Sequence, residues 1–507
     1  MSITSELLVG ATRVSHQRPW PRAVVGRTAW LQAARALGAG RATMLGLWSD
    51  GAAVHLCLGE EPILAPVVLS FVCAGGRFPS VARHHAPAGR LERAITDLHG
   101  LIAEDAPDTR PWLDHGRWGL SQPLAGGTAA PRDGISYDFL PAEGPPLHQI
   151  PVGPVHAGII EPGHFRFSAN GETVVRLEER LGYVHKGIES LMRGADLERA
   201  ARIAGRVSGD STVAYAIAFA HAVENALAAT VPERAQLLRV LMAELERLAN
   251  HFGDIGAICN DASFSLMHAH CGALRERVLR CAHQCFGHRL MMDCVRPGGV
   301  VRDLDGSGRN AISDLVAGIR RDFPELVDLY DNTASLQDRT VTTGILKPAL
   351  ALQFGASGFV GRASGRQCDA RRWPGYPPYG KLAFKSPVRT EGDVDARVWI
   401  RIEEVAESLS LIEQCLAALS AGPISTSLPI GDAAVAQREG IALVESFRGD
   451  ILAWVRFADN GRIAHCHVRD PSWFQWPLLE AAIEGNIVAD FPLCNKSFNC
   501  SYSGHDL

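Results

Sequence analysis

The sequence lacks long uncharged apolar runs. A membrane-spanning helix needs about 20 predominantly apolar residues, and no such stretch occurs in the 507 residues. The first residues, MSITSELLVG, also lack the basic start and sustained apolar run that are typical of a secretory signal. We therefore expect a cytoplasmic protein that reaches a membrane only through partner subunits, on the inner face of the cell membrane.

An excess of positive charge is also missing. The formal net charge is −5, and the basic residues are scattered along the chain. Nucleic-acid binders usually gather Lys and Arg on one face, so no nucleic-acid partner is expected. The 12 cysteines follow no regular framework, which is typical of reduced thiols in a cytoplasm.

Several cofactor motifs are absent. No GxGxxG opens a helix after a strand, and no Walker-type loop or nucleophile elbow occurs. A nicotinamide nucleotide is therefore expected only at the level of a whole complex, if at all. MHAHC (267–271) and CAHQCFGH (281–288) contain His and Cys at ligand-like spacing. A structural zinc site usually takes four ligands from two separated pairs, so we interpret both as helix packing and predict no metal site.

The composition itself is that of a globular protein, 47% hydrophobic and 21% charged. Apolar and polar residues alternate in short runs over residues 43–83, which predicts an antiparallel sheet. GRLERAITDLHGLI (89–102) has helical spacing. These elements predict a small N-terminal α/β domain over residues 1–120.

The rest of the chain predicts a different architecture. Residues 121–150 are rich in Pro and Gly and are interpreted as a linker. Two alternating strands surround Asn170-Gly171, which predicts a hairpin. Helical patterns cover residues 185–290, 309–338 and 397–419, and strands return in the last ninety residues. Residues 151–507 are thus expected to form a mainly α-helical body with small antiparallel sheets from its two ends, an α+β fold overall.

GRVSGDSTVAY (205–215) places Ser208 and Ser211 at the spacing of a metal-binding CxxC pair. Ser and Asp are also preferred helix N-cap residues, because their side-chain oxygens accept bonds from free backbone N–H groups. A capped helix start is therefore the simpler interpretation of this stretch by itself.

Further motifs give the stretch a context. In order they are VGPVHAGIIEPGHFRF, GYVHKGIE, ELERLANHFGDIGAI, VRPGGVVRDL, SLQDRTVTTGIL, GRASGRQCDARR, GDVDARVWIRIEEVAESL and DFPLCNKSFNCSYSGHDL. Together they resemble the large subunit of nickel–iron hydrogenases of the membrane-associated, formate-hydrogenlyase and hydrogenase-4 type. They are equally similar to the quinone-site subunit of respiratory complex I. LERAITDLHGL resembles the small complex I subunit that is fused to the large one in such proteins, so the resemblance covers about residues 40–507.

The resemblance implies a metal site that this chain does not keep. Family hydrogenases hold nickel and iron with two CxxC motifs, which fall here on Ser208, Ser211, Cys500 and Ser503. Thiolate is a soft anionic ligand, whereas a serine hydroxyl keeps its proton near neutral pH. We therefore predict no Ni–Fe centre. A cleft lined by these residues and Asp210 is expected to admit a small polar molecule, a quinone or water.

The quinone site implied by the complex I relatives is incomplete as well. The tyrosine that donates a hydrogen bond to the quinone falls on Gly209. The first histidine of the quinone loop matches His156, but the second falls on Ile160. A quinone therefore stays one candidate among several, and no cofactor is expected to bind this chain directly.

Charged residues suggest a proton relay. His185 and Glu189 in GYVHKGIE have i, i+4 spacing and are expected to share a helix face. Asp210 stands where hydrogenases have an apolar residue, and burial is expected to raise its pKa if it does not cap the helix. Arg362 and Asp369 match family residues that line or support the cleft.

These features lead to one hypothesis and two alternatives. The chain is expected to be a peripheral subunit of a membrane-associated redox complex, which receives electrons from an iron–sulfur partner subunit and couples them to proton or ion movement. Its other partners would be antiporter-like membrane subunits. The alternatives are a scaffold or coupling subunit without redox chemistry and a true nickel–iron hydrogenase. A cleft of several hundred cubic ångströms would favour the redox role, and packed side chains would favour the scaffold.

Overall fold

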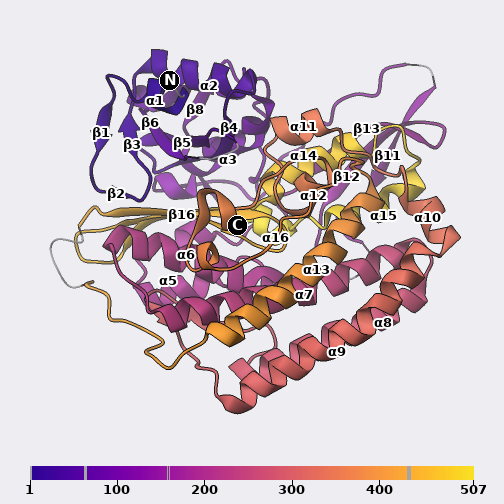
Figure 1. Cartoon of the computed structure of the whole chain (residues 1–507). Helices are drawn as coiled ribbons and strands as arrows, with labels where there is room; N and C mark the ends of the chain where they lie inside the picture. Colours follow the sequence, from indigo (N-terminus) through magenta and orange to yellow (C-terminus); the bar gives the residue numbers. More distant parts are fainter. Residues whose placement is uncertain (1–2, 62–64, 145, 157, 159, 431–435) are drawn as a thin grey trace.

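The computed structural model describes residues 3–61, 65–144, 146–156, 158, 160–430 and 436–507. Figure 1 shows long helices packed side by side, with the N-terminal segment and the C-terminal strands on one flank of them. Within the described residues, no helix combines the length and the apolar character that crossing a membrane requires.

The first sheet contains the strands expected near the N-terminus. It has the order β1-β3-β6-β5-β4, and β4, β5 and β6 pair antiparallel as predicted. Its strands are β1 (Thr12–Val14), β3 (Arg22–Val24), β4 (Thr43–Ser49), β5 (Ala53–Gly59) and β6 (Val67–Val72). The helices of this region are α1 (Ile3–Leu7), α2 (Arg27–Gly38) and α3 (Gly89–His99).

The run RFPSVA does not join this sheet. Its strand β7 (Arg77–Pro79) pairs in parallel with β8 (Ile102–Glu104), which lies beyond α3. Gly75 and Gly76 precede it with φ values of 74° and 72°. This left-handed backbone favours glycine and turns the chain away from the first sheet.

The predicted linker contains ordered structure. β9 (Leu120–Ser121) pairs with β10 (Thr128–Ala129), and β11 (Leu147–Val152) is the edge strand beside β12 (His164–Asn170). The Tyr137 ring lies 4.4 Å from the guanidinium of Arg180 and 4.9 Å from that of Arg110. These contacts fasten the segment to the body, while the domain boundaries at 120 and 150 stay predictions.

The body is built on long helices, as the sequence predicted. The helices from the hairpin to the last sheet are α4 (Ile188–Met192), α5 (Leu197–Ala204), α6 (Thr212–Leu227), α7 (Glu233–Asp261), α8 (Ser265–Phe286), α9 (Gly306–Asp331), α10 (Ala334–Thr340), α11 (Pro348–Gln353), α12 (Gly358–Ala363) and α13 (Val394–Ala418). A two-stranded sheet of β14 (Val295–Arg296) and β15 (Gly299–Val300) lies between α8 and α9.

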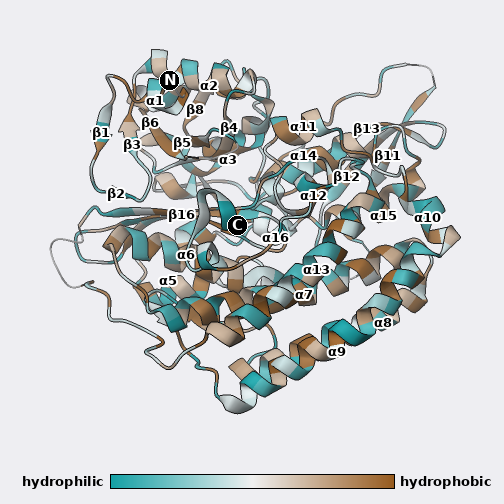
Figure 2. Ribbon diagram, viewed as in Figure 1, coloured by the Kyte–Doolittle hydropathy of each residue, from teal (hydrophilic) through white to brown (hydrophobic). Residues whose placement is uncertain are grey.

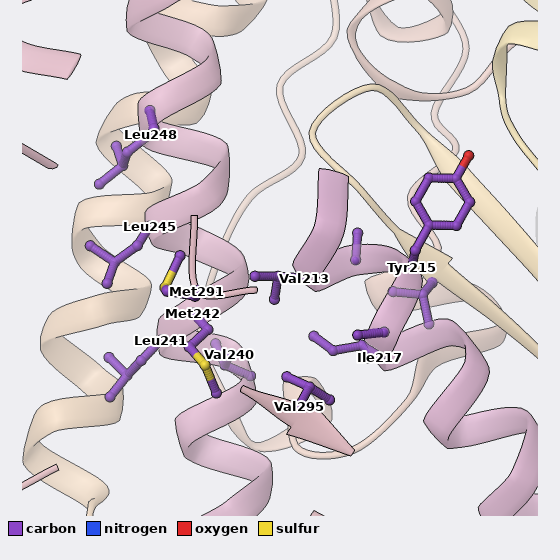
Figure 3. Packing of buried hydrophobic residues seen from close by; sticks show 14 of the residues in the cluster. Val213, Tyr215, Ile217, Val240, Leu241, Met242, Leu245, Leu248, Met291 and Val295 are labelled. Atoms are coloured by element: carbon purple, nitrogen blue, oxygen red, sulfur yellow. The ribbon is translucent and has the colours of Figure 1, made fainter. Parts of the chain in front are cut away.

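Helix α7 is the centre of the packing. Its apolar side chains Leu241 and Leu245 face Val213 and Ile217 of α6 across a shared core (Figure 3). The outer helices α8 and α9 alternate hydrophilic and hydrophobic residues along their length (Figure 2), as expected of helices with one face in the core.

The two ends of the chain meet in one sheet. Its order is β18-β17-β16-β2, and β2 (Gln17–Arg18) pairs in parallel with β16 (Glu439–Glu445). The other elements are the hairpin partner β13 (Thr173–Arg180), β17 (Asp450–Phe457), β18 (Ile463–Arg469), α14 (Ser472–Ala482), α15 (Phe491–Phe498) and α16 (Tyr502–Asp506). Long helices and several small sheets confirm the predicted α+β class.

Ion pairs fasten this junction. Glu439 is fully buried and accepts hydrogen bonds from Arg22 and Arg456. We predict that Glu439→Ala lowers the free energy of unfolding by about 3–5 kcal/mol, because two buried guanidinium groups lose a shared partner. Urea denaturation of the purified chain measures this. Glu198→Ala removes an exposed pair with Arg202 and serves as the control, expected to change stability by less than about 1 kcal/mol. Equal losses in both variants would contradict the role of Glu439.

Candidate functional site

The two segments that match the family's ligand motifs lie against each other. Ser208 and Ser211 flank the short turn before α6, and Cys500 and Ser503 lie between α15 and the end of α16. The hydroxyl oxygens of Ser208 and Ser501 are 3.2 Å apart. The fold therefore brings the predicted residues of the two motifs into one place, joined by Ser501.

A residue outside both motifs holds this place together. Arg448 is in the turn between β16 and β17, and its Nη2 lies 2.6 Å from Oδ2 of Asp210. Its Nη1 donates to the Ser211 hydroxyl at 3.1 Å, and its Nε donates to the carbonyl of Asn499. One guanidinium thus binds both segments. We call Arg448, Asp210, Ser208, Ser211 and the 499–501 backbone the polar clasp.

The state of Asp210 differs from both expectations. The positive charge and hydrogen bonds of Arg448, with further bonds from the two serines, hold the pKa of Asp210 well below its usual value despite burial. The predicted raised pKa is wrong. Asp210 does not cap α6 either, because the free N–H groups of Val213 and Ala214 donate to Glu246 on α7 at 2.7 and 3.1 Å. Burial raises the pKa of Glu246 to about 8.

The donor set does not fit a nickel–iron centre. The hydroxyls of Ser208 and Ser211 both donate to Oδ1 of Asp210, at 2.8 and 3.0 Å. Burial raises the pKa of the Cys500 thiol well above its usual value, so the remaining sulfur is held as a thiol. Within the part of the chain that the structure describes, no group of three or more His, Cys, Asp and Glu side chains could hold a metal ion.

Ser503 lies at the outer edge of the clasp. Its backbone N–H donates to Glu161 at 3.1 Å, and its carbonyl accepts a bond from Lys186 at 3.0 Å. The residues of GYVHKGIE therefore reach the C-terminal segment through Lys186. They also do so through His185, whose Nδ1 lies 2.7 Å from the carbonyl oxygen of Asp506.

His185 and Glu189 do not share a helix face, so this prediction is wrong. Helix α4 begins only at Ile188, after Gly187 with a φ of 70°. His185 stacks on Trp118, whereas Glu189 lies 2.6 Å from Nδ1 of His467 on β18. The i, i+4 rule fails because the helix starts between the two residues, and their proposed relay role remains a prediction.

The quinone-loop positions lie in the open. Gly209 is exposed, and a Cβ atom added to it would meet no atom within 4 Å. Nε2 of His156 lies 2.9 Å from the Gly163 carbonyl oxygen, and Ile160 is 41% exposed. No contact that the structure gives joins His156 to Gly209 among the described residues, so a quinone site there also stays a prediction.

Arg362 and Asp369 belong to the interior. Both are fully buried, with their charged atoms 3.9 Å apart. Arg362 also pairs with Glu404 and, at 2.8 Å, with Glu445. Burial, together with the charge of Asp369, raises the pKa of Glu445 to about 7. The two predicted residues therefore support the core under the clasp by balancing buried charge.

Little empty space lies beside the clasp. The cavity that borders Asp210, Glu246 and Asn250 has a volume of about 20 Å³, enough for about one water molecule. A larger open pocket of about 1090 Å³ lies elsewhere, over residues 371–385. The roomy cleft expected at the serines is not what the described side chains form there, because Arg448 fills the position.

Comparisons with known proteins agree with the motifs. The model of the respiratory-chain NADH dehydrogenase 49 kDa subunit matches residues 261–431, and that of nickel-dependent hydrogenases matches residues 186–253. Formate hydrogenlyase subunit 5 of Escherichia coli (strain K12) is 31% identical, over 85% of this chain and 77% of its own. An NADH-quinone oxidoreductase subunit of Herpetosiphon aurantiacus is 31% identical, over 68% and 94%.

A solved structure shows a similar fold. A chain of the membrane-bound sulfane sulfur reductase, an archaeal respiratory membrane complex, matches with a TM-score of 0.67 and 26% identity. The match covers 71% of this chain and 98% of that one. Together these similarities confirm the resemblance inferred from the sequence.

Removing the charge of Asp210 tests the clasp. We predict that Asp210→Asn lowers the free energy of unfolding at neutral pH by about 1–2 kcal/mol, a modest value because the Asp210 side chain keeps 35% of its exposure. The depressed pKa means that this stabilisation exists above the usual aspartate pKa and disappears as the pH falls through the folded value. The two proteins should thus converge in acid. Urea denaturation checks this, with the exposed Asp338→Asn on α10 as the control. A pH-independent difference would contradict it.

Glu246 makes the opposite prediction. Its raised pKa means that its neutral form stabilises the fold, so stability is lost as the pH rises from the unfolded value toward about 8. Glu246→Gln should remove this slope, which cannot exceed about 1.4 kcal/mol per pH unit for one group. Thermal unfolding between pH 5 and pH 9 measures it. The exposed Glu172→Gln should follow the wild type, and a slope unchanged in Glu246→Gln would show that another group causes it.

Proposed function

Because the chain belongs to the family that unites membrane-bound hydrogenase large subunits with the 49 kDa subunit of respiratory NADH dehydrogenase, we propose that it serves its redox complex without a Ni–Fe centre. It is a peripheral subunit of an oxidoreductase complex of this kind. It is not a true nickel–iron hydrogenase large subunit.

The polar clasp is the observation that carries the proposal. Arg448 and Asp210 occupy the centre of the former ligand positions and engage the hydroxyls of Ser208 and Ser211. A guanidinium there repels a metal cation, and hydroxyl groups that already donate to a carboxylate are poor ligands for nickel. This favours chemistry, if any, that does not pass through nickel.

In this proposal electrons arrive from an iron–sulfur partner subunit. This partner would dock beside the exposed Gly209 and the partly exposed Ser503, on the cytoplasmic side of the membrane. Antiporter-like membrane subunits would complete the assembly, and a quinone at or near the His156 loop is the candidate acceptor. The relatives' names support an assembly of this type, since they include a formate hydrogenlyase and a respiratory membrane complex.

Coupling to protons is supported by the ionisable groups beneath the clasp. Glu246 and Glu445 have pKa values raised to about 8 and about 7. Groups that titrate near the working pH can take up and release protons during turnover. The buried charges thus offer a means of linking electron arrival to proton movement.

One observation favours the scaffold as a second candidate. The cavity at Asp210 holds only about 20 Å³, far below the usual size of a ligand site. If no acceptor enters, the chain would only position its partners. The two candidates differ in whether changes at the clasp alter electron flow.

The first experiment identifies the complex. We predict that affinity purification through this chain, from membranes of its host, recovers an iron–sulfur subunit with a reducible cluster and nickel well below one atom per chain. Mass spectrometry, electron paramagnetic resonance and elemental analysis measure these. Recovery of the chain alone, or nickel at one atom per chain, would overturn the proposal.

The second experiment separates redox role from scaffold. In the purified complex, Asp210→Asn should slow reoxidation of the reduced cluster about tenfold or more, because electrostatics at a redox site change rates strongly, while Asp338→Asn should not. Stopped-flow spectroscopy follows the cluster. Unchanged kinetics in an intact Asp210→Asn complex would favour the scaffold.

A further inference from the structure

Two buried glutamates share one arginine at the junction of three segments. Arg90 on α3 places its Nη1 3.1 Å from Oε2 of Glu179 on β13 and its Nη2 2.7 Å from Oε1 of Glu480 on α14. The backbone N–H of Glu179 also donates to Oε1 of Glu480 at 2.8 Å. The two carboxyl groups are therefore neighbours on one guanidinium.

The charges around this pair do not balance if both carboxyls are ionised. Glu179 is fully buried, and its Oε1 has no hydrogen-bond partner among the described residues. The nearby Glu178 already pairs with Arg110 at 2.7 Å, so it brings no cation to the site.

The other cation-bearing neighbours are already engaged. Arg93 pairs with Asp108 at 3.0 Å, and Arg180 donates to backbone carbonyls around Trp112. Cys500 and Tyr502 face the pair from the C-terminal segment, and burial keeps both protonated by raising their pKa values. One cation thus serves two carboxyls, and an unpaired buried charge is costly.

We propose that Glu179 and Glu480 hold one proton between them at neutral pH, as a store that opens to solvent at Glu480 and lies next to the clasp at Glu179. The Glu480 side chain is 21% exposed and Glu179 is not exposed at all, so protons would enter at Glu480. Glu179 is within electrostatic range of Cys500, one of the four former ligand positions.

The electrostatics agree with this assignment. Burial, followed by the charge of Glu480, raises the pKa of Glu179 well above its usual value. Burial also raises the pKa of Glu480. Two carboxyls that cannot both ionise share a proton, as like charges in close contact do in general.

The proton store is independent of which electron carriers the complex uses. Its use in turnover, where the stored proton would accompany an arriving electron, rests on the proposed function. The plain alternative is a clamp, in which Arg90 only fastens α3 to the body and both glutamates are ionised.

Infrared spectroscopy of the purified full chain separates the two. At pH 7 the wild type minus Glu179→Gln difference spectrum should contain the carbonyl stretch of one protonated carboxyl group. Glu480→Gln should lose the same band, because the remaining glutamate then has Arg90 to itself and ionises. Arg90→Gln should keep the band, and the exposed Glu172→Gln should leave it unchanged.

The outcomes decide the proposal. Loss of the band in both glutamine variants with retention in Arg90→Gln supports a shared proton. Absence of the band from both difference spectra means a clamp and overturns it, whatever the redox activity of the complex. Glu480 reaches the surface, so Glu480→Gln keeps the test decisive if Glu179→Gln does not fold, with circular dichroism as the check of folding.

Discussion

The guanidinium of Arg448 is the contact on which the candidate site depends. It binds the carboxylate of Asp210, the hydroxyl of Ser211 and the backbone of Asn499, and so joins two segments far apart in sequence. In relatives the resemblance assigns this joining to thiolates around two metals. Here hydrogen bonds and one ion pair do it, which accounts for the small cavity and for the low pKa of Asp210.

The same compensation of charge extends through the core. Arg247, Arg362 and Arg401 are fully buried, and each lies against a carboxylate or a backbone carbonyl. Buried charges require such partners, because removal from water is costly for an ion that lacks one. An interior of this kind shifts several carboxyl pKa values toward neutral pH, so the capacity to handle protons does not depend on a metal.

The sequence was sufficient where the signal is local. Alternating residues predicted β4 to β6, Asn170-Gly171 predicted the hairpin, and helical spacing predicted α7 and α13. The serines and Cys500 were found because the motifs carry their order. Local patterns of this type reflect backbone geometry, which a sequence alone expresses.

The errors arose where the deciding partner is distant. Asp210 received the wrong pKa because Arg448 lies 238 residues away in SFRGD, which has no ligand-like spacing. His185 was placed on a helix that starts only at Ile188. Glu246 caps α6 from another helix, and no spacing rule within SGDS could indicate it.

The central claim is that a protein-only contact has replaced the metal centre. Anomalous X-ray scattering at the nickel absorption edge, recorded from crystals of the complex, examines that place directly. The account predicts no anomalous peak among Ser208, Ser211, Cys500 and Ser503, and electron density for the Arg448 guanidinium against Asp210. A nickel peak bound to Cys500, with Arg448 turned away, would contradict it.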